Sequence, residues 1–181
     1  MMYYLLLLIL LGYLHKRYIP YLPGINISND VAEAKEVLKI SRKRNQFDID
    51  FFKLTDPSIS HAFKEYGSIK NLNKIIYQFW ISALILPLKT IINRARPYQI
   101  NKKIKYLKSK TGNTPSLPAG HAFQAYYLAY ILSKKYPNDK KKLNNIAKEC
   151  DLVRVKAGIH YPSDGKLAKD MVYLLIRFNL I

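Results

Sequence analysis

RVKAGIHYPSD, residues 154–164, ends a stretch of the chain that begins at Lys89 and in which rare polar residues recur at helical spacings. The same stretch contains KTIINRARP (residues 89–97) and SLPAGH (residues 116–121). Each segment places cationic or imidazole side chains beside apolar helical sequence. Together the three segments predict a pocket for a phosphate-like anion that contains two histidines, and the rest of the chain is expected to form a scaffold around it.

The composition favours one folded domain with a basic surface. Of 181 residues, 49% are hydrophobic, which is enough for a sizeable core. Lys and Arg number 30 against 12 acidic residues, giving a net charge of +18. This charge favours anionic partners such as nucleic acid, an anionic membrane surface or phosphorylated substrates. A biased genome is an equally good explanation of the excess lysine. The single cysteine, Cys150, excludes an intrachain disulfide framework.

Residues 1–22 form a hydrophobic N-terminal segment. Met1 to Leu14 is apolar almost without a break, and the basic residues His15, Lys16 and Arg17 follow. Fourteen helical residues reach only about 21 Å, against roughly 30 Å for the hydrocarbon core of a bilayer. We therefore expect a short or tilted membrane anchor, with a cleaved signal or a buried core helix as alternatives. An anchor followed by basic residues favours the cytoplasmic side for residues 23–181.

The sequence from residue 23 onward predicts helices and no strand. Apolar periodicity and capping residues indicate helices over residues 29–44, 48–54, 56–66, 69–96, 118–136, 143–153 and 162–179. In the fourth of these, residues 75–88 are apolar almost all round, so a central buried helix is expected, with a membrane span as the competing interpretation, and Pro87 should kink it. The predicted fold is a single-domain all-α bundle of roughly six to eight helices.

Three cations are candidates for binding the anion. Lys89 and Arg96 lie two turns apart and would project from one face of the same helix, whereas Arg94 would point elsewhere into solvent. Arg154 follows Ala147 and Cys150 at helical spacing, so it extends a buried stripe. A buried guanidinium requires a partner, and acids are scarce in this chain. A bound anion would supply that partner.

Two histidines are candidates for the chemistry. His121 lies in the first turn of a helix entered through Ala119 and Gly120, where backbone N–H groups point outward and can bind an anion. An imidazole at this position can protonate a leaving oxygen. His160 is followed by Asp164, which can accept a hydrogen bond from one ring nitrogen and leave the other free as a nucleophile. His61 lies apart from these residues, and a packing or surface role is expected for it.

At these positions the chain resembles the type 2 phosphatidic acid phosphatase superfamily, which includes lipid phosphatases, class A acid phosphatases and vanadium haloperoxidases. Lys89–Pro97 matches K-x₆-R-P, Pro118–His121 reads PAGH, and Arg154–Asp164 matches R-x₅-H-x₃-D, in the order of that family's signature. The resemblance implies that His160 forms a phosphohistidine, that Asp164 orients it and that His121 protonates the leaving group. It also implies that Lys89, Arg96, Arg154 and the backbone at Ala119 and Gly120 hold the phosphoryl oxygens, without metal or cofactor.

Two positions differ from the family pattern. The family has serine where this chain has Ala119 and Val153. A neutral hydroxyl hydrogen bond contributes about 0.5–1.5 kcal/mol, and a charge-assisted one roughly 1.5–3 kcal/mol. Ala119 is therefore expected to weaken the site without removing its chemistry, and Ser116 is a candidate for a substitute hydroxyl.

The function expected from the sequence is hydrolysis of a phosphomonoester by a metal-independent phosphatase. Its partner would be a phosphorylated small molecule or a lipid phosphate such as phosphatidic acid, at a membrane reached through residues 1–22. Nucleic acid is not the expected partner. A mean hydropathy of -0.13 favours the soluble branch of the family with an added anchor. The alternatives are a vanadate-dependent haloperoxidase and a basic protein with a decayed site that binds nucleic acid or anionic lipid.

Overall fold

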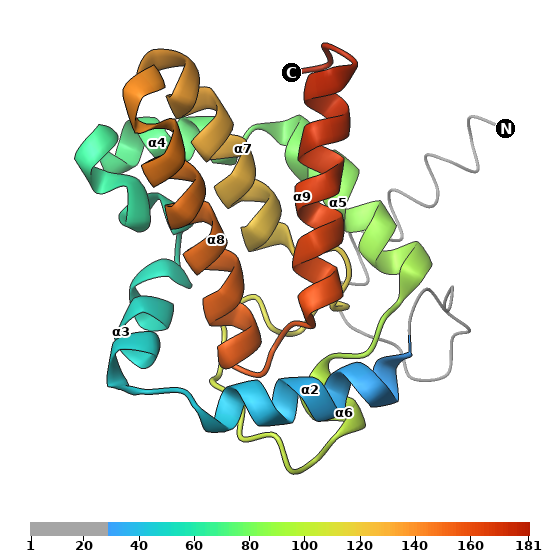
Figure 1. The fold of residues 1–181 in the computed structure, drawn as a ribbon. Coiled ribbons are helices and arrows are strands. Elements are labelled where there is room, and N and C mark those ends of the chain that lie inside the picture. The colour runs from blue at the N-terminus through green and yellow to red at the C-terminus, as the bar shows by residue number, and fades with distance from the viewer. Residues whose placement is uncertain (1–28) are drawn as a thin grey trace, which may run out of the picture.

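α7 (Gly120–Lys135) is the helix around which the others are arranged in the computed structural model, which describes residues 29–181. It packs against α8 (Lys140–Lys156) and α9 (Pro162–Arg177), and Figure 1 shows the three running side by side. Its buried residues are Ala122, Phe123, Ala125, Tyr126, Tyr127, Leu128, Ala129 and Leu132. The small alanines among them let neighbouring helices approach closely.

The remaining elements surround this three-helix core. They are α2 (Asp30–Arg42), α3 (Gln46–Thr55), the 3₁₀ helix η1 (Ile59–Tyr66), α4 (Ile69–Ile76), α5 (Phe79–Ile92), α6 (Pro97–Ile100) and the short 3₁₀ helix η2 (Pro137–Asp139). α2 lies across the lower end of the bundle in Figure 1, where it contacts α6 and α8. The all-α prediction is confirmed, because residues 29–181 contain eight α-helices and no strand. The N-terminal segment, residues 1–22, lies outside the described residues.

The helix boundaries follow local capping chemistry. Asn29 caps α2 by accepting a hydrogen bond from Ala32 N at 3.1 Å. Asn45 and Asp48 form a capping box that starts α3. In α8 the predicted stripe is confirmed, since Ala147, Cys150 and Arg154 are all buried. Cys150 is a free, buried thiol within the main hydrophobic core.

The single long helix predicted over residues 69–96 is wrong. The chain breaks at Tyr77 and Gln78, where α4 ends and the N-cap of α5 begins. α5 accommodates Pro87 and ends at Ile92, because Asn93 adopts a left-handed conformation with φ 46°. Lys89 and Arg96 therefore lie on different elements, with Arg96 at the N-cap of α6.

α5 is also not the central buried helix that its composition predicted. Its buried side chains form one stripe, Ile81, Ile85, Lys89 and Ile92, whereas Phe79 is 77% exposed. Within residues 29–181 no single helix is long and apolar enough to cross a membrane. Within that range the required length and apolar character are reached only by a pair of helical segments together, Ile69–Ile76 and Phe79–Ile100, which are bent by 53° relative to each other.

A third boundary differs from the prediction at Asp56 and Pro57. Asp56 is the C-cap of α3 and does not start a helix, while Ser58 caps η1. The Asp56 carboxylate accepts hydrogen bonds from Ser109 Oγ at 2.6 Å and Lys110 N at 3.0 Å. It therefore attaches the basic loop of residues 101–115 to the end of α3.

Candidate active site

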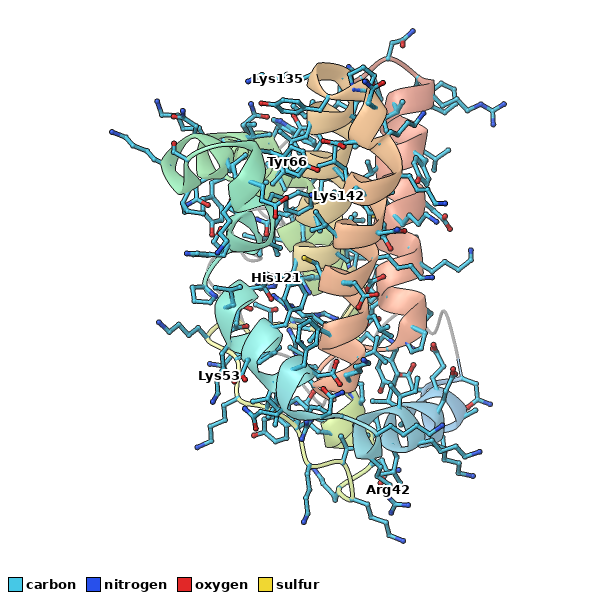
Figure 2. All side chains as sticks on the ribbon, turned by 60° about the vertical axis from the view of Figure 1, so that its left-hand side comes forward. Arg42, Lys53, Tyr66, His121, Lys135 and Lys142 are labelled. Carbon is cyan, nitrogen blue, oxygen red and sulfur yellow. The ribbon has the colours of Figure 1, made fainter. Side chains whose placement is uncertain are left out.

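The three sequence segments meet at one cavity of about 290 Å³. The polar side of its wall includes Lys89, Arg96, His121 and His160, together with Gly120. Its apolar side is formed mainly by α5 and the break before it, through Tyr77, Ile81, Ile85 and Leu86. Figure 2 places His121 midway along the bundle, whereas Arg42 and Lys53 lie at its outer surface. The cavity thus combines two imidazoles and two cations beside an apolar wall.

His160 is positioned by a sharp turn between α8 and α9. Gly158 makes this turn with φ +76°, and a Cβ there would lie 2.6 Å from Ile104 Cγ2. The His160 ring is 3% exposed. Its Nδ1 lies 3.0 Å from Asp164 Oδ2, and its Nε2 lies 3.3 Å from Arg96 Nη1. Because the carboxylate can only accept and the guanidinium can only donate, the proton belongs on Nδ1 and the lone pair on Nε2.

Asp164 is fully buried and held as a carboxylate. Burial alone would raise its pKa, but the His160 ring, Arg94 and Ser116 lower it to about 2. Tyr161 N donates to Oδ2 at 2.9 Å, and Ser116 Oγ donates to the same oxygen. Burial, with a contribution from the charge on Arg96, lowers the pKa of His160 to about 3. His160 is therefore neutral at pH 7, as a nucleophile requires.

Lys89 and Arg96 hold the loop that precedes α7. Lys89 Nζ donates to the carbonyl oxygens of Pro115 and Ser116 at 2.6 and 3.2 Å. Arg96 donates to the carbonyl oxygens of Thr114 and Ile159 at 2.9 and 2.8 Å. Burial lowers the pKa of both cations, that of Lys89 well below its usual range. Both groups are thus desolvated near His160, and an anion bound there would favour their charged forms.

His121 occupies the first turn of α7, as predicted. Its Nε2 lies 3.0 Å from the carbonyl oxygen of Asp56, so Nε2 carries a proton. Nδ1 is left as the nitrogen that can accept a second proton. Burial, followed by the charge on Arg154, lowers the pKa of His121 well below its usual value. The ring is therefore neutral at pH 7.

Gly120 and Ala119 contribute differently to the start of α7. Gly120 lines the cavity, and first-turn N–H groups such as its own have no intrahelical carbonyl partner. Ala119 is the N-cap, without a side-chain capping bond, and its N–H donates to the Asp164 carbonyl at 3.3 Å. The Ser116 hydroxyl donates to Asp164, so it supports the nucleophile pair and does not replace the hydroxyl missing at Ala119.

Arg154 is buried as predicted, but it does not line the cavity. Its guanidinium donates to Thr55 Oγ1 and to the Thr55 carbonyl, each at 2.7 Å, and lies 5.3 Å from the centre of the Phe52 ring. Its Nε has no hydrogen-bond partner among residues 29–181. The Nε–H of Arg154 is therefore a buried donor that could bond to an acceptor from outside these residues.

The prediction that Arg94 points into solvent is wrong. Arg94 is 5% exposed and bonds to Asp164 Oδ1 at 2.6 Å. The error follows from the early end of α5, since a helical-face argument does not apply beyond Asn93. The available signal was the pair of acids Asp30 and Glu33 at the start of α2, in a chain that has few acids. Within residues 29–181 no group of three or more His, Cys, Asp or Glu side chains is arranged to hold a metal ion.

Comparison with known families gives a match that spans the candidate site. The family model of the PAP2 superfamily matches residues 72–168, which is more than half of the chain. The match includes all three segments of the signature, from Lys89 to Asp164. A search of curated proteins finds no match.

Proposed function

Because the chain belongs to the PAP2 superfamily, we propose that it is a phosphatase that hydrolyses a phosphomonoester through a phosphohistidine at His160. Membership supports phosphatase-type activity in general. The observation that supports the finer proposal is the His160 ring, with Nδ1 bonded to Asp164 and Nε2 at the cavity beside Arg96. An unprotonated Nε2 next to a cation is suited to attack a bound phosphoryl group.

The phosphoryl group would be held by cations and backbone donors. Arg96, Lys89 and the N–H of Gly120 surround the cavity. The unsatisfied Nε of Arg154 is a further candidate donor, although Arg154 does not line the cavity. Charge-assisted hydrogen bonds of this kind contribute roughly 1.5–3 kcal/mol each. Such donors stabilise the charge on the equatorial oxygens as the transferring group passes between the attacking and leaving atoms.

In the first step, His160 Nε2 bonds to phosphorus while the bond from phosphorus to the ester oxygen breaks. His121 gives the leaving oxygen a proton. An anionic phosphate nearby raises the pKa of His121 from its depressed value, so its second nitrogen, Nδ1, can take up that proton on substrate binding. In the second step, His121 removes a proton from water, and the oxygen of this water displaces His160 from phosphorus. Inorganic phosphate leaves and His160 regains its lone pair.

The test compares His160→Ala with His61→Ala, using p-nitrophenyl phosphate as the substrate. His61 lies in η1 outside the cavity, where its Nδ1 is 3.0 Å from the Ser58 carbonyl oxygen. We expect His160→Ala to lose hydrolysis and His61→Ala to retain it. Chelators should leave the parent activity intact. Full activity in His160→Ala, or chelator-sensitive turnover, would refute the mechanism.

The apolar wall of the cavity bears on the choice between lipid and soluble phosphates. The apolar wall from α5 favours a phosphate attached to an apolar group, which includes a lipid phosphate such as phosphatidic acid. A panel of phosphatidic acid in mixed micelles, a nucleotide and a small sugar phosphate separates these classes. The wall predicts the highest kcat/KM with phosphatidic acid, and a preference for the sugar phosphate would contradict this assignment.

A further inference from the structure

The proposed reaction does not use Arg94, yet this residue forms three ion pairs near the cavity. Each nitrogen of its guanidinium bonds to a different carboxylate: Nε to Asp30 at 2.9 Å, Nη2 to Glu33 at 2.5 Å and Nη1 to Asp164 at 2.6 Å. Its Cζ lies 3.8 Å from the centre of the Tyr161 ring. Arg94 does not line the cavity.

This cluster is unusual for the composition of the chain. The sequence has only 12 acidic residues against 30 basic ones, yet three carboxylates share one arginine. Exposed ion pairs contribute little to stability, but the Arg94 side chain is 4% exposed and that of Asp164 is buried completely. Removing one partner of a buried pair leaves an uncompensated buried charge, so the loss of any one of these side chains should be unfavourable.

The geometry points to a role for Arg94 in orienting the nucleophile, and this inference rests on the proposed function. We propose that Arg94, held by Asp30 and Glu33, is a positioning residue that fixes the Asp164 carboxylate so that it aligns His160. Arg94 takes Oδ1 of that carboxylate, which leaves Oδ2 for His160 Nδ1 at 3.0 Å. With both oxygens bound, the carboxylate cannot rotate freely. The imidazole plane and its tautomer are fixed in turn.

Ser163 extends the same network to the backbone of α9. Its hydroxyl accepts from Arg94 Nη1 at 2.7 Å and donates to Glu33 Oε2 at 2.7 Å. Its N–H donates to Glu33 Oε1 at 3.1 Å. The first turns of α2 and α9 are therefore joined through Arg94 and Ser163. It follows that α2, which does not line the cavity, controls the position of His160.

The experiment uses the full chain with Glu33→Gln, Arg94→Lys and Arg94→Ala, assayed with p-nitrophenyl phosphate. Glu36→Gln is the matched control, because Glu36 is an exposed acid on the same helix. We expect Arg94→Ala to lower kcat about 100-fold, the scale of a misplaced reacting group, with KM changed less than about twofold. Glu33→Gln and Arg94→Lys should lower kcat by smaller factors, and Glu36→Gln should match the parent.

The pH profile separates positioning from a general loss of structure. Arg94 lowers the pKa of Asp164, and loss of its charge also makes the neighbouring His160 easier to protonate. The acid limb of kcat/KM, which reports free-enzyme groups, should therefore move to higher pH in Arg94→Ala, which removes the charge, and should stay near that of the parent in Arg94→Lys, which keeps it. Millimolar guanidinium should restore part of kcat in Arg94→Ala by occupying the vacated space.

The outcomes distinguish this inference from the proposed function. An inactive parent enzyme would refute the phosphatase proposal itself. If the parent is active and Arg94→Ala, Arg94→Lys and Glu33→Gln all match it in kcat, the role of Arg94 is refuted. It is also refuted if kcat falls in step with the folded fraction measured by circular dichroism, with an unshifted limb and no rescue by guanidinium.

Discussion

Replacing Gly120 by alanine separates anion binding from folding. A Cβ at this position would meet no atom closer than Ile85 Cγ2, at 3.8 Å, which is an ordinary van der Waals contact. The residue is the first of α7, where alanine is compatible with the backbone. Replacing glycine by alanine at such a site stabilises a protein by about 0.4–1 kcal/mol, because the unfolded chain loses freedom. The Gly120→Ala protein should therefore be as stable as the parent or more stable.

Binding of phosphate should change in the opposite direction. The added methyl group would occupy space at the cavity and keep a phosphoryl oxygen from the first-turn N–H groups. Loss of one charge-assisted hydrogen bond costs roughly 1.5–3 kcal/mol, which corresponds to about a 10- to 150-fold loss. The assay measures kcat/KM, the inhibition constant of inorganic phosphate and the urea midpoint.

The matched control for this substitution is Gly67→Ala. Gly67 has extended backbone, lies outside the cavity and would place its Cβ 3.5 Å from Leu72 Cδ2. We expect its phosphate affinity to equal that of the parent. If Gly120→Ala folds normally and binds phosphate as well as the parent does, the assignment of the α7 start to anion binding is wrong.

Three further predictions concern other parts of the chain. Burial raises the pKa of Asp151 to about 6, so this carboxyl destabilises the fold as pH rises through about 4 to 6. A pKa shift corresponds to about 1.4 kcal/mol per unit. The free energy of unfolding in urea should therefore be higher for Asp151→Asn than for the parent by up to about 3 kcal/mol at pH 7, and should differ little at pH 4. Ala119→Ser should add an N-cap to α7, raising stability by about 0.5–2 kcal/mol in the same assay and kcat/KM severalfold. Removal of residues 1–22 should release the protein from membranes in a flotation assay while p-nitrophenyl phosphate hydrolysis persists; continued membrane binding would contradict the anchor.

Local signals in the sequence were sufficient for most of the helices. α2, α3, α7, α8 and α9 have strong caps or long apolar stripes, and their predicted bounds differ from the structure by a few residues at most. The region around α5 was predicted wrongly, because an apolar run does not show where a helix ends. Asn93 adopts a left-handed conformation with φ 46°, which the apolar pattern does not signal. This one residue changes the placement of Arg94 and Arg96.

The structure brings most of the candidate site residues together, but several of their bonding partners were not predicted from the sequence. Five of the eight residues singled out, Lys89, Arg96, Gly120, His121 and His160, line the cavity. Asp164 bonds to His160 as expected from their spacing of one turn. The long-range partners could not be predicted, because they join residues far apart in the chain. Arg154 with Thr55 and Arg94 with Glu33 are examples.

Detection of the phosphorylated enzyme tests the proposed reaction at His160. The parent and Asp164→Asn are mixed with p-nitrophenyl phosphate, quenched in alkali, where phosphohistidine survives, and digested for mass spectrometry. We expect a phosphoryl group on His160, labile to acid, and less of it in Asp164→Asn. Rapid turnover with no covalent phosphate on His160, or with phosphate on another residue, would contradict this expectation.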